Sequence, residues 1–189
     1  MSSGIPRLEL SDMPAELSHA LQPRVTRLGY LGEFFKWAAH QPAALRTFMT
    51  LTDDLKAALP DNLTEVVAFT VAGVMQNDYE RHQHERLCRT LGFSDEWIRA
   101  AATLRDGPLR DTERLVQRLT IAVIAQRGQH VSDEFNAVVA AIGPAGAMAA
   151  LFLIGRYVTH SLIVNALQLA PPVPSIFEKG AAADICDEP

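Results

Sequence analysis

Apolar side chains recur at intervals of three and four residues along almost the whole chain. This spacing places them on one face of an α-helix, and the alternation of apolar and polar residues that is typical of strands is absent. The pattern therefore predicts an all-α fold. The expected helices cover residues 14–22, 28–40, 42–59, 62–75, 79–91, 111–128, 132–142 and 144–170, with one more beginning at 94.

Prolines and capping residues set the expected helix ends. Pro23 is expected to end the first helix, because proline lacks the backbone N–H that an inner helical position donates. Asn62 and Glu65 have the spacing of a capping box, in which the glutamate bonds back to the start of its own helix. Asp78 and Ser94 are placed to cap the helices that follow them.

No change of composition marks a linker, so residues 1–189 are expected to form one domain with extended ends at 1–12 and 171–189. Residues 136–155 carry no charge, but Gly143-Pro144 divides them into two short helices, which argues against a membrane span. The N-terminus lacks the apolar core of a secretory signal, and two cysteines are too few for a disulfide scaffold. We therefore expect a cytoplasmic protein.

The net charge of −5 is opposite to that of most nucleic-acid-binding proteins, so no nucleic-acid partner is expected. Candidate chemistry lies in residues 77–88 instead. On a helix, Glu80, His84 and Cys88 are spaced four residues apart and share one face. A carboxylate beside a histidine orients the ring and favours its protonated form, which suits a general acid or base. The alternative is an ordinary helix-surface pair.

His82 lies on another side of that helix and is expected to be solvated. A metal site would need a third ligand beside Glu80 and His84, for which Glu65 and His40 are the candidates. The His-Glu-x-x-His pattern of zinc proteases is absent, and no second cluster has the spacing of metal ligands. We therefore expect neither a metal nor a cofactor.

The segment 65–98 resembles the signature of the carboxymuconolactone decarboxylase and alkyl hydroperoxidase D superfamily. In redox-active members, a glutamate lies twelve residues before a Cys-x-x-Cys-x-x-x-His motif. Here Glu65 lies twelve residues before Asn77, Asn77 and Glu80 occupy the two cysteine positions, and His84 matches the histidine. The resemblance continues through 92–98 and the second half of the chain. It implies an alkyl hydroperoxidase D-like helical bundle that assembles into a homo-oligomer, as a dimer, trimer or hexamer.

The two substituted cysteine positions exclude the dithiol peroxidase reaction, because a thiolate needs a second thiol to form the disulfide. Cys88 shares a face with His84, so a one-cysteine peroxidase is an alternative to simple packing of that thiol. Glu80 in place of the second cysteine resembles the decarboxylase branch, whose chemistry is proton transfer without a cofactor. This branch implies a small carboxylated or lactone metabolite as substrate.

In that interpretation, His84 donates or relays the proton and Glu80 orients it. Glu65 is either a second acid or base, or only the partner of Asn62 in a capping box. For substrate binding, Asn77 could donate its amide, although it also suits a helix-ending turn.

Tyr157 and His160 are three residues apart, so they share a face and could line the same cavity or belong to the core. Arg81, Arg86 and Arg89 are the nearby cations for an anionic ligand, and their spacing also suits a solvated surface. A different class of function remains open throughout: a catalytically inactive member that serves as a binding or assembly module.

Overall fold

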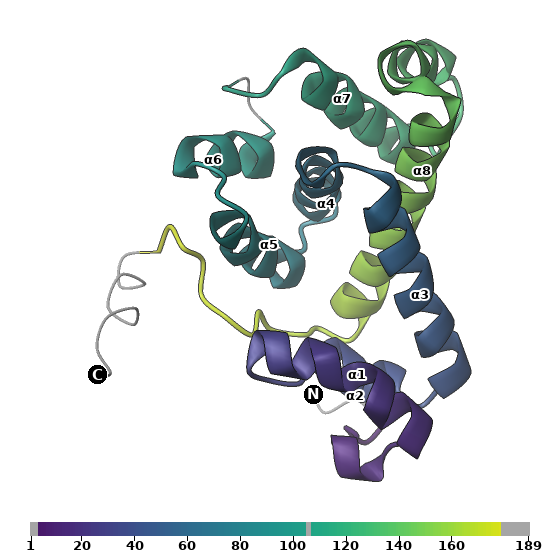
Figure 1. The fold of residues 1–189 in the computed structure, drawn as a ribbon, viewed down its shortest axis with the longest axis vertical. Coiled ribbons are helices and arrows are strands. Elements are labelled where there is room, and N and C mark those ends of the chain that lie inside the picture. Colours follow the sequence, from purple (N-terminus) through teal and green to yellow (C-terminus); the bar gives the residue numbers. More distant parts are fainter. Residues whose placement is uncertain (1–3, 105–106, 179–189) are drawn as a thin grey trace.

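The computed structural model describes residues 4–104 and 107–178, and in these ranges the regular structure is entirely helical. This confirms the predicted all-α fold. A short 3-10 turn, Leu10–Asp12, precedes eight α-helices (Figure 1). They are α1 (Ala15–Leu28), α2 (Glu33–Ala38), α3 (Pro42–Ala58), α4 (Asp61–Val74), α5 (Asp78–Thr90), α6 (Asp95–Thr103), α7 (Asp111–Ala125) and α8 (Ser132–Ala166).

Helix α4 lies at the centre of the bundle and contacts α5, α6, α7 and α8 (Figure 1). Ten consecutive residues, 63–72, are buried, because apolar side chains occur on every side of this helix. A helix that is apolar all round is stable only when other elements surround it. The main apolar core therefore forms around α4.

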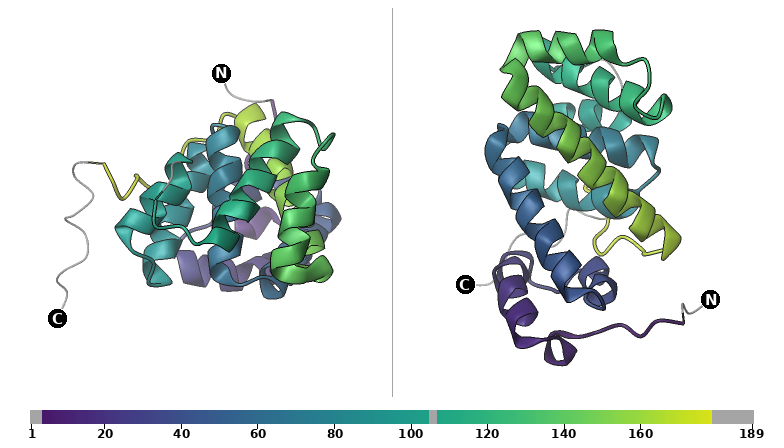
Figure 2. Two further views of the ribbon diagram at one scale, coloured as in Figure 1. Left: turned by 90° about the horizontal axis from the view of Figure 1, so that it is seen from above. Right: turned by 90° about the vertical axis from the view of Figure 1, so that its right-hand side faces the viewer.

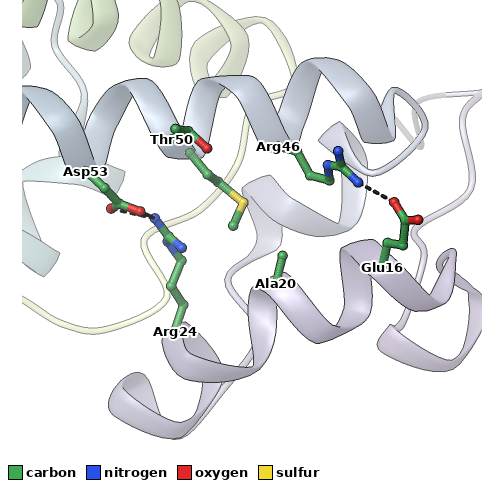
Figure 3. Close-up of a pocket in the computed structure, with 7 residues that line it drawn as sticks. Glu16, Ala20, Arg24, Arg46, Thr50 and Asp53 are labelled. Carbon is green, nitrogen blue, oxygen red and sulfur yellow. Dashed lines mark hydrogen bonds and ion pairs between the residues drawn. The ribbon is translucent and has the colours of Figure 1, made fainter.

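A second apolar cluster joins α1, α2 and α3 at one end of the molecule (Figure 2, right). Tyr79 of α5 and Val164 of α8 belong to it, so the N-terminal helices pack directly on the larger bundle. Arg24 of α1 also pairs with Asp53 of α3 at 2.6 Å. An open groove of about 320 Å³ lies between α1 and α3, and Arg46 of α3 pairs with Glu16 of α1 across it (Figure 3).

Two predicted boundaries in the N-terminal part are wrong. Pro23 does not end the first helix but lies inside α1, which continues to Leu28. A single inner proline removes only one helical hydrogen bond, and the buried Leu17 and Leu21 anchor the turns before it. The chain then turns at Gly29, where φ is 78°, so the second helix begins at Glu33 instead of residue 28.

The capping predictions for α4 and α5 are also wrong. Asn62 donates a hydrogen bond to Glu113 of α7 at 2.7 Å, and Glu65 does not bond back to the start of α4. Helix α5 is capped by Asn77, whose side-chain oxygen accepts from the backbone N–H of Glu80 at 3.1 Å. The predicted Ser94 cap of α6 is confirmed.

Helix α8 is broken at the predicted place, since Gly143 has a non-helical backbone with φ of 76°. Among the described helices, α8 alone is long and apolar enough to cross a membrane, and this break divides it. Its outer face exposes Met148, Phe152 and Leu162. The predicted homo-oligomer and cytoplasmic location remain predictions.

Residues 171–178 continue beyond α8 without helical structure and run along α5; we call them the strap. The rest of the expected C-terminal extension, residues 179–189 with Cys186, lies outside the described residues, as do residues 1–3.

Candidate active site

A cavity of about 440 Å³ lies between the N-terminal helices and the bundle. Helices α1, α2, α3, α5 and α8 contribute to its wall, together with Val173 of the strap. Its inner part contains Glu80, His84, Tyr157 and His160. Three of the aromatic lining residues, Phe34, Phe35 and Phe48, come from α2 and α3. The cavity is thus a space lined by both aromatic and ionisable side chains, as in many small-molecule sites.

His84 lies between two carboxylates. Its Nδ1 is hydrogen-bonded to Oε2 of Glu65, which reaches it from α4. Its Nε2 lies 3.1 Å from Oε2 of Glu80, one turn earlier on α5. The hydroxyl of Tyr157 is 3.5 Å from the same Nε2. The predicted pairing of Glu80 with His84 is present, and α4 supplies the second carboxylate.

The other oxygen of Glu80 faces α8. Its Oε1 lies 2.8 Å from Nδ1 of His160, in contact but without hydrogen-bond alignment. Nη1 of Arg156 is 3.6 Å from the same oxygen and is buried without a hydrogen-bond partner. Arg156 is held in place by Thr52, which accepts from its Nε at 2.9 Å, and by the Phe48 ring, 4.8 Å from its guanidinium carbon.

The two carboxylates and His84 favour each other's charged forms. Burial alone would raise the pKa of Glu80, but His160 and His84 outweigh it and hold that pKa well below its ordinary value. Burial, the largest single influence, also raises the pKa of Glu65, but His84, together with Lys56 and Cys88, outweighs it and lowers that pKa below 4.5. Burial lowers the pKa of His84, yet Glu65 and then Glu80 bring it well above 6.5. His84 is therefore an imidazolium at neutral pH.

The pKa of His160 is shifted in the opposite direction, below its ordinary value. Burial is the largest influence on its pKa and lowers it, and the attraction of Glu80 does not compensate because Arg156 and His84 are also positive. His160 therefore loses its proton at lower pH than His84 does. The site contains two imidazoles against Glu80 whose pKa values are shifted in opposite directions, and such separated pKa values are typical of acid–base sites.

Lys56 and Arg156 add positive charge that the sequence interpretation missed. Nζ of Lys56 lies 3.7 Å from Oε1 of Glu65, and both cations line the cavity. Neither residue is near α5 in sequence, and a single lysine or arginine on a helix does not by itself indicate a functional site. One available signal is that Arg156 directly precedes Tyr157, a predicted substrate-binding residue.

Asn77 occupies a structural position. Its Oδ1 caps α5, its Nδ2 donates to Oγ of Ser161 at 2.9 Å, and it is absent from the cavity wall. Both polar groups of the amide are therefore engaged within the protein. Glu65 also lies behind the wall and reaches the cavity through His84. Of the residues predicted to bind substrate, Tyr157 and His160 line the cavity.

Cys88 is fully buried, and its Sγ lies 3.6 Å from Oε2 of Glu65. Burial and, after it, the negative charge of Glu65 raise the pKa of this thiol far above its ordinary value. The thiol is therefore protonated and a poor nucleophile. This favours the packing interpretation of Cys88 over the one-cysteine peroxidase.

His82 is not solvated as predicted. It is buried, and its Nδ1 donates to the carbonyl of Val173 in the strap at 3.1 Å. Helical spacing correctly placed it away from Glu80, but nothing in the pattern indicated that the strap would cover that side. His40, a candidate metal ligand, is exposed and bonded to the carbonyl of Pro6. Within residues 4–104 and 107–178, no three His, Cys, Asp or Glu side chains form a group that could hold a metal ion.

Both the sequence and the fold match known proteins. Residues 42–123 match the carboxymuconolactone decarboxylase family. The fold is similar to an alkylhydroperoxidase AhpD core, an uncharacterized peroxidase-related protein from Ralstonia eutropha JMP134. The TM-score is 0.80 at 16% identity, over 90% of this chain and 93% of that one. No protein of curated function matches the sequence.

Two further solved structures share the fold. An uncharacterized peroxidase-related protein from Silicibacter sp. TM1040 has a TM-score of 0.78 at 14% identity, over 90% of this chain and 91% of that one. A cysteine-to-alanine variant of the debrominase Bmp8, in complex with 2,3,4-tribromopyrrole, has a TM-score of 0.77 at 15% identity, over 89% and 91% respectively. The family match over residues 42–123 and the shared AhpD-like fold together support this chain as a member of the carboxymuconolactone decarboxylase and AhpD-like superfamily.

Proposed function

We propose that the chain is a cofactor-independent acid–base enzyme, a decarboxylase-type lyase or an isomerase, that acts on a small carboxylated or lactone metabolite. The observation that carries this proposal is His84, held protonated between Glu65 and Glu80 at the wall of an aromatic cavity. Burying three ionisable groups together costs free energy, and a helical bundle of this size does not need them for its core. Such clusters are typical of sites where protons are transferred.

His84 is the proton donor in this proposal. Its Nδ1 is fixed by Glu65, so Nε2 is the nitrogen that faces Glu80 and the cavity. When a β,γ-unsaturated lactone acid loses carbon dioxide, the electron pair of the broken carbon–carbon bond enters a conjugated dienolate. The Nε2 proton of His84 is then delivered to carbon, and the ring regains a proton from solvent. An isomerase would use the same group after proton abstraction by Glu80.

Lys56 and Arg156 support an anionic substrate and an anionic intermediate. Both line the cavity, and the Nη1 atom of Arg156 is buried without a hydrogen-bond partner. A cation in a site that excludes water stabilises a nearby carboxylate or enolate oxygen much more than it would in solution. The aromatic walls would hold the flat, unsaturated part of such a molecule.

Isotope exchange tests the proposal even though the product is not identified. A panel of lactone acids and keto acids is incubated with the protein in deuterium oxide, and exchange at carbon next to the carbonyl is followed by NMR. We expect at least one compound to exchange or to lose carbon dioxide. Glu80→Gln should lower that rate by about 10²-fold or more, because the carboxylate that orients and charges His84 is lost.

Glu96→Gln is the matched control, since Glu96 is an exposed carboxylate on α6. It should leave the rate unchanged. No exchange with any compound, or equal rates for the Glu80 and Glu96 variants, would contradict the proposal.

One observation favours a second candidate, an inactive member that serves as an assembly module. The outer face of α8 exposes Phe152 at 58% and Leu162 at 57%, more than any other large apolar side chain described. Apolar side chains exposed along one helix are typical of a surface that another subunit covers. A chain of 20.7 kDa that sediments as a monomer would contradict this second candidate, and a dimer, trimer or hexamer would agree with it.

A further inference from the structure

The three arginines of α5 differ in their partners. Arg81 is paired with Asp78 at 2.7 Å, and Arg89 is paired with Asp95 at 2.7 Å. Arg86 has no ion pair with any carboxylate of the described residues, although it lines the cavity. Its Nε atom is buried without a hydrogen-bond partner. A partly buried guanidinium in this state retains unused donors and an uncompensated charge.

The strap forms the surroundings of Arg86. The only partner of its guanidinium among the described atoms is the carbonyl of Pro174, accepting from Nη2 at the long distance of 3.4 Å. The strap itself is firmly attached, because Glu85 accepts from the Ser175 hydroxyl at 2.7 Å and from the Ile176 N–H at 3.1 Å. Arg86 therefore lies beside a fixed segment, and its partner there is a neutral carbonyl, which binds a guanidinium less strongly than a carboxylate does.

Arg86 and His84 lie at opposite edges of the side of α5 that faces the cavity. They are two residues apart, which places their side chains roughly 160° apart around the helix axis. A helix with its side chains is about 10–12 Å wide. Tyr79 and Gln83, which also line the cavity, lie between the two edges. A ligand that contacts both edges is therefore an elongated molecule.

We propose that Arg86 and the strap form a second anion-binding subsite, so that the ligand carries a carboxylate or another anionic group at the end remote from His84. This inference rests on the cavity being the substrate site. In the free protein, the Pro174 carbonyl occupies one donor of Arg86, and the ligand's anionic group replaces it with a charge-assisted contact.

Two probes of matched shape test the subsite. Terephthalate has a carboxylate at each end of a benzene ring, and 4-methylbenzoate has a methyl group in place of one of them. Isothermal titration calorimetry should show that the protein binds terephthalate at least about tenfold more tightly, as expected for a hydrogen bond to a charged group. Arg86→Gln should remove that preference, and Arg89→Gln should keep it.

Arg86→Lys is a second variant that retains the charge but lacks the fork of donors, so it should keep only part of the preference. Thermal unfolding shows whether each variant is folded. Failure of terephthalate to bind, equal binding of the two probes, or a full preference in Arg86→Gln would overturn the proposal.

The isotope-exchange assay separates this result from the proposed function. If isotope exchange proceeds but the protein binds the two probes equally, the anion-binding subsite is contradicted and the proposed function is not. If the protein clearly prefers terephthalate but exchanges no compound, the proposed proton transfer is contradicted and the subsite is not.

Discussion

Helices α4 and α5 are consecutive in the chain, but they bury opposite kinds of side chain. Helix α4 buries ten residues in succession, and Glu65 is the only ionisable one among them. Helix α5 buries Glu80, His82, His84 and Glu85 beside Tyr79 and Cys88. The first helix is held by apolar packing on all sides. The second is held by ion pairs and hydrogen bonds to α4, α8 and the strap.

This difference indicates where stability and chemistry are located. Burying an apolar side chain is favourable wherever it fits, whereas a buried ionisable group is tolerated only with a partner. The partners of the α5 residues come from distant parts of the chain: Glu65, His160 and the strap. Substitutions in α4 should therefore change stability most, and substitutions in the ionisable cluster should change stability in a way that depends on pH.

The largest expected effect is that of Phe69→Ala in α4. Phe69 is fully buried in the main core, so the free energy of unfolding should fall by about 3–5 kcal/mol. Urea unfolding followed by circular dichroism measures this loss. Phe69→Leu should lose clearly less, because it leaves a smaller cavity, and a loss below about 1 kcal/mol for the alanine variant would contradict the central role of α4.

Glu65→Gln should have an intermediate effect that varies with pH. The amide keeps the shape of the side chain but removes the carboxylate that faces Nδ1 of His84 and Nζ of Lys56, which should cost about 1–3 kcal/mol at neutral pH. Because the pKa of Glu65 is lowered from 4.5, its contribution is present above that value and is lost as the pH falls through the lowered pKa.

The contribution of His84 has the opposite sign of pH dependence. Its pKa is raised well above 6.5, so its stabilisation is complete below 6.5 and is lost as the pH rises through the raised value. Unfolding measured across this range should show both limbs in the natural protein and a weaker alkaline limb in Glu65→Gln. A parallel pH dependence of the two proteins would contradict the coupling of Glu65 to His84.

Asn77→Ala should have the smallest effect of the three. It removes the α5 cap and the hydrogen bond to Ser161, so the free energy of unfolding should fall by about 1 kcal/mol. Because Asn77 lies outside the cavity wall, terephthalate should bind this variant as it binds the natural protein. Loss of binding in a folded Asn77→Ala protein would show that the amide has the substrate-binding role predicted from the sequence.

Local patterns predicted most of the fold. The range 42–59 agrees with α3 to one residue, and the Gly143 break and the Ser94 cap lie where the sequence indicated. The predicted helix ends and caps were wrong where one residue type can play two structural roles. Pro23 can end a helix or lie within one, and Asn62 can cap its own helix or bond to another. Contacts between distant segments decide such cases, and no local pattern contains them.

The candidate site shows the same division. The i, i+4 spacing gave the pair Glu80 and His84, and the family resemblance added Glu65. Arg156 was missed as a site residue because its place depends on contacts with Thr52, more than 100 residues away in sequence. The covering of His82 was missed for the same reason, because the strap reaches α5 only in the folded chain.

The protonation state of His84 is the most direct test of the proposed chemistry. Its imidazole signals can be followed by NMR through a pH titration of the natural protein, Glu65→Gln and Glu80→Gln. We predict a pKa well above 6.5 in the natural protein, a large decrease in Glu65→Gln and a smaller one in Glu80→Gln, since Glu65 contributes more. A His84 that titrates near 6.5 in all three proteins would contradict the proposed proton donor.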